Sequence, residues 1–482
     1  MTKKENNNSC KYKLLQPTAN GKNDESDLIE GKDEEQGIQR IQALLADWLR
    51  MENVVVLTAA GCSVSEGGRL MAGPEKNNLE HLVLNAVEQC NISEEEKAII
   101  AERKDSPNPS SFEEWLSYLF NVPNITEAKS SPVSRIYWKG GDNIELSQEK
   151  KKNIQKLISR AIYAECALEI RSDTLSADEK SNNNNPGGHF PFLAKLIARD
   201  SNLGRTHLFT LNYDTLFEQA LEELGIQYFD GFTGKASARF DPSVYGLDIY
   251  YPGDVAEGRV RRFDKFLQFY KLHGSIHWSF DSQGICRAQH KDLSFAQEYR
   301  DANDPKKKAE MLASDDFSKI SRFGILPTSQ KFSQTLDMPY AHLFRLFHAR
   351  LNQPQTFLLV LGYGFGDEHV NRIIETALTN PSLVMLVVEP NPESKVITER
   401  LTHYQNLGQR VFVLTERCEK NPCSFKVANT ERCEKKPCSF KVANFADFAQ
   451  NIMPDVKWLD DFKRLRQYER EIAQTNKNGS EG

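Results

Sequence analysis

Apolar residues along the chain form two patterns, short continuous runs and longer stretches with helical spacing. Continuous runs occur at residues 54–57, 207–210, 357–361 and 383–388. Helical spacing is found at residues 38–49, 216–224 and 370–378. A short continuous run is typical of a strand buried on both faces, and repeated strand-then-helix units are typical of a parallel sheet. The pattern therefore predicts an α/β fold with a doubly wound parallel sheet.

A long segment between the first two predicted strands indicates a large helical insertion. Residues 75–188 show helical spacing and end in a stretch rich in Asn, Pro and Gly. This segment would interrupt a Rossmann-like domain formed by residues 37–74 and 189–455. Residues 1–36 have almost no apolar period and are predicted to be a disordered tail. Residues 456–482 are predicted to be a polar C-terminal tail.

A tandem duplication lies near the end of the Rossmann-like domain. Residues 415–429 recur as 430–444 and differ only at Asn421 and Lys436. Two copies do not make a repeat fold, which needs at least three stacking units. The copies carry cysteines at positions 418, 423, 433 and 438. Because duplicating one Cys pair gives four cysteines without any requirement for metal, we predict no metal site there.

Composition and charge limit the classes of function. The 482 residues carry 61 Lys and Arg against 67 Asp and Glu, a net charge of −6, so no overall positive field would attract nucleic acid. The chain has no apolar run of about 18 residues that would span a membrane, and no apolar segment follows the charged N-terminus as in a secretory signal. Nine cysteines, an odd number, fit reduced thiols. We predict a cytoplasmic protein.

Small and polar residues follow each predicted strand and are the candidate chemistry. They are the segments 58–63, 212–214 and 362–367, and His273 is predicted at a further strand end. Taken singly, an Asn or Asp after a strand is more often a cap or turn residue, and a lone His is more often structural. Ligands of doubly wound sheets bind at the carboxyl ends of the strands, so we expect these segments to share one cleft.

Four motifs in this order resemble the sirtuin-like (SIR2-like) domain family. They are Thr-Ala-Ala-Gly-Cys-Ser, Thr-Leu-Asn-Tyr-Asp, Lys-Leu-His-Gly-Ser and Gly-Tyr-Gly-Phe-Gly-Asp. The resemblance covers about residues 40–450 in layout and is closer to bacterial antiphage proteins than to deacetylases. It is closest to subunits that pair with a HerA-type ATPase, through residues 224–234 and 362–372. It implies NAD as substrate, antiphage defence by NAD depletion, a HerA-type ATPase partner, a homo-oligomer, and nucleic acid reached only through the partner.

Asn212 and His273 are the predicted catalytic pair. Cleavage of the bond between nicotinamide and ribose passes through an oxocarbenium-like state with a good leaving group, so few protein groups are required. The amide of Asn212 can orient a water or a ribose hydroxyl, and His273 can accept a proton near neutral pH. The resemblance implies the same two roles, and it implies that Asp214 holds the nicotinamide carboxamide.

The remaining expected contacts with NAD come from two strand ends. Ala60, Gly61 and Ser63 would present backbone N–H groups to the pyrophosphate at the start of a helix. The resemblance places Gly362 and Asn391 around the adenosine half of NAD.

The sequence departs from the sirtuin-like family at its first motif and from the sirtuin deacylases at a zinc module. Ala59 replaces the first glycine of the family's first motif, and residues 66–69 replace the proline and Phe-Arg that commonly follow, which leaves open the loop conformation over the nicotinamide but not the phosphate role. The two Cys-x2-Cys pairs of the deacylases' structural zinc are missing, since only Cys286 lies near His273 downstream. We therefore predict an enzyme that hydrolyses NAD to nicotinamide and ADP-ribose, with deacylation as the alternative.

Two alternatives from other classes remain. A non-catalytic sensor of NAD or ADP-ribose would keep the phosphate turn but has no need of Asn212 and His273. A nucleic-acid-acting effector needs metal-binding carboxylates or a basic groove, for which Arg261, Arg262 and residues 306–308 offer a local patch.

Two further groups of residues receive structural interpretations. Asp367, His369 and Asn371 are predicted to cap and solvate the start of a helix rather than to bind metal. Cys62 is predicted to pack within its turn, because no base is adjacent to it in sequence.

Overall fold

A computed structural model of the chain describes residues 10–16, 26–71, 78–105, 112, 115–116, 119, 148–170, 187–200, 202–234, 237–256, 259–281, 284–287, 293–314, 339–406, 410–417 and 444–455. The four cysteines of the tandem duplication and the predicted C-terminal tail lie outside these residues.

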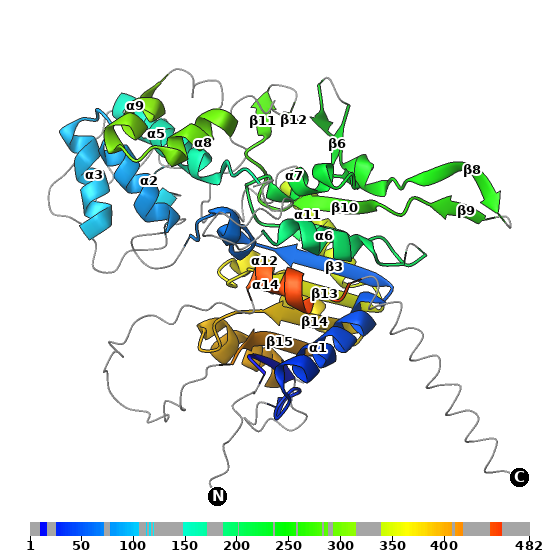
Figure 1. Cartoon of the computed structure of the whole chain (residues 1–482). Coiled ribbons are helices and arrows are strands. Elements are labelled where there is room, and N and C mark those ends of the chain that lie inside the picture. The colour runs from blue at the N-terminus through cyan, green and yellow to red at the C-terminus, as the bar shows by residue number, and fades with distance from the viewer. Residues whose placement is uncertain are drawn as a thin grey trace, which may run out of the picture.

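The centre of the molecule is a nine-stranded sheet with the order β2-β1-β15-β14-β13-β3-β4-β10-β5 (Figure 1). Seven of its strands run parallel: β3 (Asn53–Thr58), β4 (His207–Thr210), β5 (Gln227–Phe229), β10 (Phe266–Lys271), β13 (Thr356–Leu361), β14 (Leu383–Val388) and β15 (Val411–Glu416). β3 is flanked by β13 on one side and by β4 on the other, so the parallel sheet extends from β3 in both directions. The predicted doubly wound α/β sheet is confirmed.

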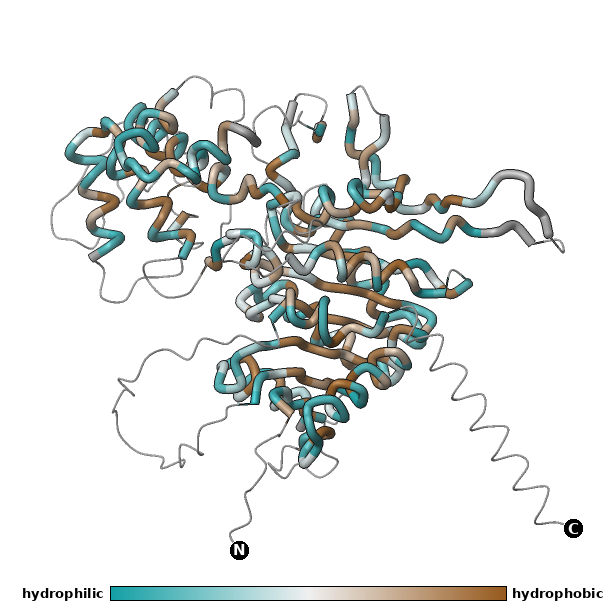
Figure 2. The backbone as a smooth tube through the Cα atoms, viewed as in Figure 1, coloured by the Kyte–Doolittle hydropathy of each residue, from teal (hydrophilic) through white to brown (hydrophobic). Residues whose placement is uncertain are grey.

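Helices cover both faces of this sheet. One face carries α1 (Glu34–Leu49), α6 (His189–Ile197), α7 (Leu216–Glu223), α14 (Phe445–Asp447) and η6 (Phe448–Ile452). The other carries α11 (Tyr340–Leu351), α12 (Glu368–Ala377), η5 (Val396–Leu401) and α13 (Thr402–Asn406). Val54 and Val56 of β3 join the first core, and Val55 and Leu57 join the second. Burial on both faces explains the continuous apolar runs, which appear as hydrophobic central strands in Figure 2.

A separate group of helices packs beside the carboxyl ends of the strands. It contains α2 (Leu79–Glu88), α3 (Glu94–Asp105) and α5 (Gln148–Cys166) from the segment predicted as a helical insertion. It also contains α8 (Leu293–Asp301) and α9 (Pro305–Ala313), which come from much later in the chain and lie against α5 and α2 (Figure 1). Together these five helices are called the helical module below. α8 and α9 lie outside the segment predicted as the helical insertion, so their place in this module is not a predicted feature.

The predicted disordered tail at residues 1–36 is wrong for part of its length. β1 (Tyr12–Gln16) pairs antiparallel with β15, and β2 (Ser26–Asp27) pairs with β1. Tyr12 is fully buried, and its hydroxyl donates a hydrogen bond to Oδ2 of Asp447 over 2.9 Å. A strand of five residues that pairs with a segment about 400 residues away leaves no local periodic signal, which explains the error.

The remaining strands form two smaller sheets. β8 (Tyr250–Ala256) and β9 (Arg259–Arg262) make a two-stranded ribbon, and β11 (Trp278–Asp281), β12 (Gly284–Arg287), β7 (Arg239–Phe240) and β6 (Phe232–Thr233) make a four-stranded sheet. Short 3-10 helices are η1 (Ala60–Glu66) and η3 (Pro242–Gly246). Among the described residues, no helix is long and apolar enough to cross a membrane.

Candidate active site

A cavity of about 630 Å³ lies at the carboxyl ends of the central strands, within the range typical of small-molecule sites. One wall comes from the loops that follow β3, β4, β10 and β13, and the other comes from the helical module. The predicted site residues that line it are Ala60, Ser63, Asn212, Asp214, His273 and Gly362. The wall from the helical module includes Leu79, Glu80, Arg103, Glu165 and Cys166. Four segments that are distant in sequence therefore meet at one site.

The turns after β3 and β13 cross at two glycines. A Cβ atom on Gly61 would lie 2.6 Å from Cα of Gly362, and Gly362 has a positive φ of 63°. The backbone N–H of Gly61 donates to the carbonyl of Gly362 over 3.0 Å. Gly61 is not among the residues that line the cavity. Its N–H is used in the bond to Gly362, so the expected donation to a pyrophosphate would require that bond to break. Its role in the structure is to let the two turns touch.

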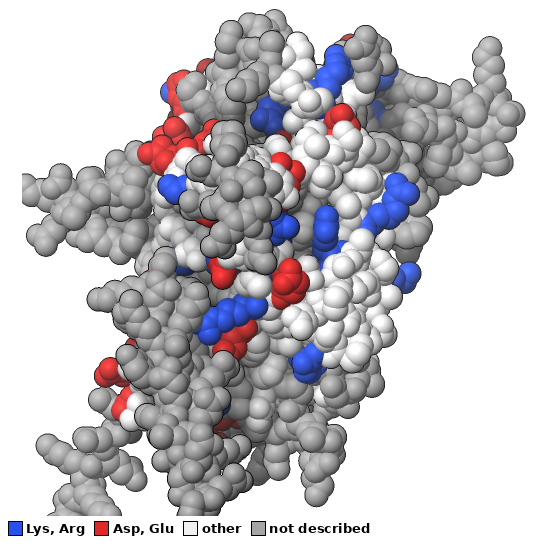
Figure 3. Space-filling model, turned by 90° about the vertical axis from the view of Figure 1, so that its right-hand side faces the viewer, with Lys and Arg blue, Asp and Glu red and all other residues white. Residues whose placement is uncertain are grey.

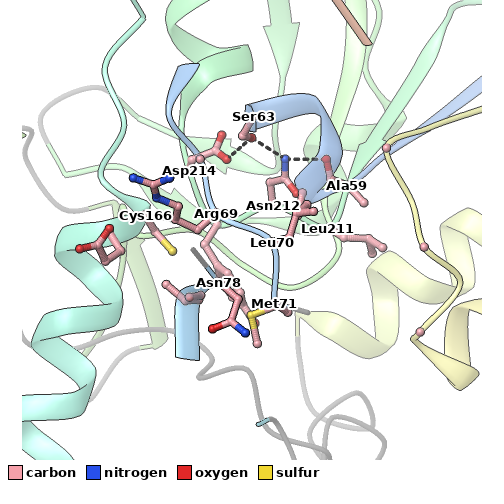
Figure 4. A pocket seen from close by; sticks show the side chains of 18 of the residues that line it. Ala59, Ser63, Arg69, Leu70, Met71, Asn78, Cys166, Leu211, Asn212 and Asp214 are labelled. Carbon is pink, nitrogen blue, oxygen red and sulfur yellow. Dashed lines mark hydrogen bonds between the residues drawn. The ribbon is translucent and has the colours of Figure 1, made fainter. Parts of the chain in front are cut away.

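Ser63 links the turn after β3 to the turn after β4 (Figure 4). Its hydroxyl donates to Oδ2 of Asp214 over 2.6 Å and accepts from Nδ2 of Asn212 over 2.9 Å. Nδ2 of Asn212 also donates to the carbonyl of Ala59 over 3.1 Å. Both amide hydrogens of Asn212 are thus used within the protein. The amide carbonyl, Oδ1, is the group that remains to accept a hydrogen bond from a ligand.

Asp214 is held by several donors beneath the cavity. Burial raises the pKa of its carboxyl group, while Lys271 and the Ser63 hydroxyl oppose that shift. Oδ1 accepts from the backbone N–H of Leu216 over 3.2 Å. The ammonium group of Lys271 donates to the backbone carbonyl of Asp214 and, over 2.9 Å, to Oε1 of Glu218. These contacts fix the turn that presents Asn212 and Asp214.

Lys271 and Glu218 form a buried ion pair below the site. The side chains are 3% and 14% exposed, respectively. Burial raises the pKa of Glu218, and the charge of Lys271 opposes this shift. Lys271 belongs to the Lys-Leu-His-Gly-Ser motif, but the ion pair is not among the predicted features of the site. A Lys at the end of a strand that is buried on both faces needs a buried partner of opposite charge. This is the feature of the sequence that could have indicated the ion pair.

His273 approaches the carboxylate of Asp367, a residue predicted to cap a helix. His273 is buried, and its Nε2 atom lies 3.0 Å from Oδ2 of Asp367. Asp367 is also the N-cap of α12, since its Oδ1 accepts from the backbone N–H groups of His369 and Val370. The predicted cap is present. The contact with His273, which joins segments 94 residues apart, carried no signal in the sequence.

The loop from Gly362 to Asp367 is held in a strained conformation. Phe365 has a φ of 52°, which is uncommon for a residue with a side chain, and its ring packs against Tyr363. Nδ2 of the buried Asn371 donates to the carbonyl of Phe365 over 2.9 Å, and the hydroxyl of Tyr363 donates to Oδ1 of Asn371 over 2.9 Å. Backbone strain held by surrounding contacts is common at functional sites.

Asn391 lies outside the cavity. It follows β14, and its backbone N–H donates to Oε1 of Glu389, while its Oδ1 accepts from the backbone N–H of Glu393. These are the bonds of a local turn, and Asn391 is not among the residues that line the cavity. The structure therefore brings together four of the predicted NAD contacts, Ala60, Ser63, Asp214 and Gly362, around the catalytic pair but leaves Gly61 and Asn391 aside.

The wall from the helical module carries charge. Burial raises the pKa of Glu165, an effect that Lys308, Arg69 and Arg300 oppose. Arg103 is paired with Glu80 through an Nε–Oε1 distance of 2.6 Å.

Cys166, which lines the cavity, and Cys62, in the turn after β3, behave as packing residues. Burial raises the pKa of both Cys62 and Cys166 well above the ordinary thiol value, which keeps them as neutral thiols. Cys62 also donates to the carbonyl of Leu361 over 3.4 Å. The described part of the chain contains no group of three or more His, Cys, Asp or Glu that could hold a metal ion.

A doubly wound sheet with a cavity where its strands end is the architecture of Rossmann-like, dinucleotide-binding proteins. Residues 206–408 match the family model of the SIR2-like domain. The match supports the SIR2-like family that the motifs indicate, and such a domain points to NAD-related chemistry. It includes Asn212, Asp214, His273 and Asp367 but begins after Ser63. No curated protein matches the chain.

Proposed function

We propose that this protein hydrolyses NAD to nicotinamide and ADP-ribose, with Asn212 and His273 as the catalytic residues. The observation that carries the proposal is that Asn212, Asp214 and His273, from two different strand ends, line one cavity. These are the residues that the resemblance assigns to the ribose and the nicotinamide. The SIR2-like match over the same segment supports NAD as the substrate.

The hydrogen bonds at the site suggest a separate role for each of these residues. Because its Nδ2 hydrogens are occupied, Asn212 would accept a hydrogen bond at Oδ1 from the attacking water or from a ribose hydroxyl. Water oxygen would bond to C1′ of the ribose as the C1′–N bond breaks, and the pyridinium leaves as neutral nicotinamide with the bonding electron pair. The proton lost by the water would pass to His273. Asp214 would orient the carboxamide of the leaving group.

The region downstream of His273 favours hydrolysis over deacylation. Sirtuin deacylases, to which the resemblance extends, carry a structural zinc in this region. In this chain the described strands β6, β7, β11 and β12 pack through aromatic rings, with Trp278 within 5.8 Å of both Phe232 and Phe240 between ring centroids. Cys286 donates to the backbone carbonyl of Ser279. An aromatic cluster thus stabilises this small sheet.

The biological role and the partners rest on the resemblance. We propose that NAD depletion by this protein serves antiphage defence, that it assembles as a homo-oligomer, and that a HerA-type ATPase is its partner. Coexpression of both chains during phage infection, with cellular NAD measured over time, tests this role. Unchanged NAD in infected cells that carry both chains would contradict it.

The alternative of direct nucleic-acid binding is not favoured by surface charge. Lys, Arg, Asp and Glu are interspersed over the described part of the face in Figure 3. Two residues of the local basic patch at Arg261, Arg262 and residues 306–308 have acidic partners. Lys307 pairs with Glu298, and Arg262 lies 3.6 Å from Asp248. A mobility-shift titration with duplex DNA at increasing salt tests this alternative.

The proposed activity is tested by incubating the purified protein with NAD, alone and with a HerA-type ATPase, and quantifying nicotinamide by chromatography. Asn212→Ala and His273→Ala should abolish release, whereas the exposed-site controls Asn202→Ala and His348→Ala should retain it. Adding an acyl-lysine peptide to the reaction distinguishes hydrolysis from deacylation, because in deacylation the release of nicotinamide would depend on the peptide. NAD binding without nicotinamide release would indicate the sensor.

A further inference from the structure

The carboxylate of Asp367 has two partners that use different oxygens. Oδ1 accepts from the backbone N–H groups at the start of α12, at 3.0 and 3.3 Å. Oδ2 lies 3.0 Å from Nε2 of His273. The cap holds Oδ1, so Oδ2 is the oxygen that is left to interact with the imidazole. Capping requires only Oδ1, so the position of Oδ2 beside a buried histidine indicates a second role for Asp367.

The surrounding loop prevents this carboxylate from moving away. Asn371, which is 1% exposed, bonds both to the carbonyl of Phe365 and to the hydroxyl of Tyr363. The same hydroxyl also lies 3.0 Å from the backbone carbonyl of Asp367, so its single hydrogen is shared between the two acceptors. The strained φ of Phe365 is therefore held by contacts on both sides of it. Such a rigid support is what a group that must orient a catalytic side chain requires.

The 3.0 Å approach of Oδ2 to Nε2 favours one of the two neutral tautomers of His273. A carboxylate accepts hydrogen bonds and does not donate them, so a neutral His273 that donates to Oδ2 would carry its hydrogen on Nε2. Nδ1 then carries the lone pair. The rings of Tyr213 and Phe344 are both near the imidazole, each with its centroid 6.3 Å away.

We propose that Asp367 is a positioning residue that orients His273 through Nε2 and leaves Nδ1 as the proton-accepting nitrogen. The inference rests on the proposed hydrolysis, because it assigns His273 as the base of that reaction. Asp367 itself need not touch NAD for this role. The fixed tautomer and orientation would be in place before the substrate binds.

The test uses Asp367→Asn, because Asn is as good an N-cap as Asp but carries no charge. Its amide would donate to Nε2 and drive the hydrogen of His273 to Nδ1, the wrong nitrogen. We expect kcat to fall on the order of 10²-fold or more, with little change in KM. Asp367→Glu should recover part of kcat. The matched control is Asp33→Asn, at the N-cap of α1, where the carboxylate accepts from the backbone N–H of Gln36 over 2.8 Å.

The pH dependence gives a readout that a cap alone would not move. A carboxylate next to an imidazole favours its protonated form, so the limb on which activity rises with pH should shift to lower pH in Asp367→Asn. Other charged or titratable groups near this region are Asp214, Glu165, Arg69 and His369, and they are the same in both proteins. An unshifted limb, or a loss of kcat equal to that of Asp33→Asn, would overturn the proposal.

A spectroscopic measurement separates this inference from the proposed function. Nitrogen-15 shifts of labelled histidine, assigned with His273→Gln, report the tautomer without any turnover. We expect hydrogen on Nε2 in the unsubstituted protein and on Nδ1 in Asp367→Asn. Hydrogen on Nδ1 in both would overturn the inference. Absence of nicotinamide release with the expected tautomers would instead refute the hydrolase and leave the positioning contact standing.

Discussion

The hydroxyl of Ser63 donates a hydrogen bond of 2.6 Å to the carboxylate of Asp214, although the two residues are 151 positions apart. The bond joins the turn after β3 to the turn after β4 at the floor of the cavity. It also partly compensates the cost of burying Asp214, since the hydroxyl opposes the burial-driven rise of its pKa. The same hydroxyl accepts from Asn212, so one small side chain supports both proposed substrate contacts.

Replacing Ser63 with Ala should impair both stability and activity. The buried Asp214 loses a donor, its pKa rises further, and the free energy of unfolding should fall by about 1–3 kcal/mol. Nicotinamide release should fall by roughly 10-fold or more, because Asn212 also loses a partner. Urea unfolding and the release assay measure the two effects. Ser159→Ala, which removes a serine hydroxyl bonded to a backbone carbonyl in the helical module, is the control. Equal activities of the two variants would refute a role of Ser63 at the site.

Gly362 should not tolerate a side chain, whereas its neighbour Gly364 should. A Cβ atom on Gly362 would lie 2.6 Å from the backbone nitrogen of Cys62, and its φ of 63° disfavours other residues. A Cβ atom on Gly364 meets nothing within 4 Å. We expect Gly362→Ala to lower the free energy of unfolding by roughly 1–3 kcal/mol and Gly364→Ala to change it by less than about 0.5 kcal/mol. Thermal or urea unfolding compares them. Similar losses in both variants would contradict the crossing of the two turns.

Breaking the buried ion pair should cost more than removing it entirely. Lys271→Met leaves Glu218 buried without its cation, and we expect a loss of about 3–5 kcal/mol in unfolding free energy. Adding Glu218→Gln should restore most of that loss. Urea unfolding of both single variants and the double variant gives the coupling energy. A double variant as unstable as Lys271→Met would mean that the contact of Lys271 with the Asp214 carbonyl matters more than the pair.

His189 should make the protein less stable at mildly acidic pH. It is fully buried against Phe217 and Phe445, and burial lowers its pKa to about 3 from an ordinary value of 6.5. As pH falls below about 6.5 the unfolded chain binds a proton that the folded protein excludes, so this contribution to stability is present above pH 6.5 and is lost between pH 6.5 and 3. The loss at pH 5 amounts to ~2 kcal/mol.

The measurement is urea unfolding at pH 7 and pH 5 for the unsubstituted protein and for His189→Phe. The variant should lose less stability between the two pH values, by about the amount given above. Other buried groups, including His207 with its lowered pKa, titrate in both proteins and cancel in the comparison. Parallel declines in the two proteins would show that His189 is not excluded from protonation.

The sequence predicts the parts of this fold that depend on local pattern. Runs at 207–210 and 383–388 coincide with β4 and β14, because strands buried on both faces must be apolar at every position. β1 and the attachment of α8 and α9 to the helical module depend on contacts between distant segments, which no local periodicity records. The same distinction holds at the site. Polar residues at strand ends indicated Asn212, Asp214 and His273, but the pairing of His273 with Asp367 depends on how two loops meet.

The central claim is tested most directly by product analysis of NAD incubated with the purified protein, with NAD binding measured in parallel by calorimetry. We predict nicotinamide and ADP-ribose in equal amounts from the unsubstituted protein, and no products from Asn212→Ala or His273→Ala. NAD bound by the unsubstituted protein without any product, with and without a HerA-type ATPase, would contradict the account.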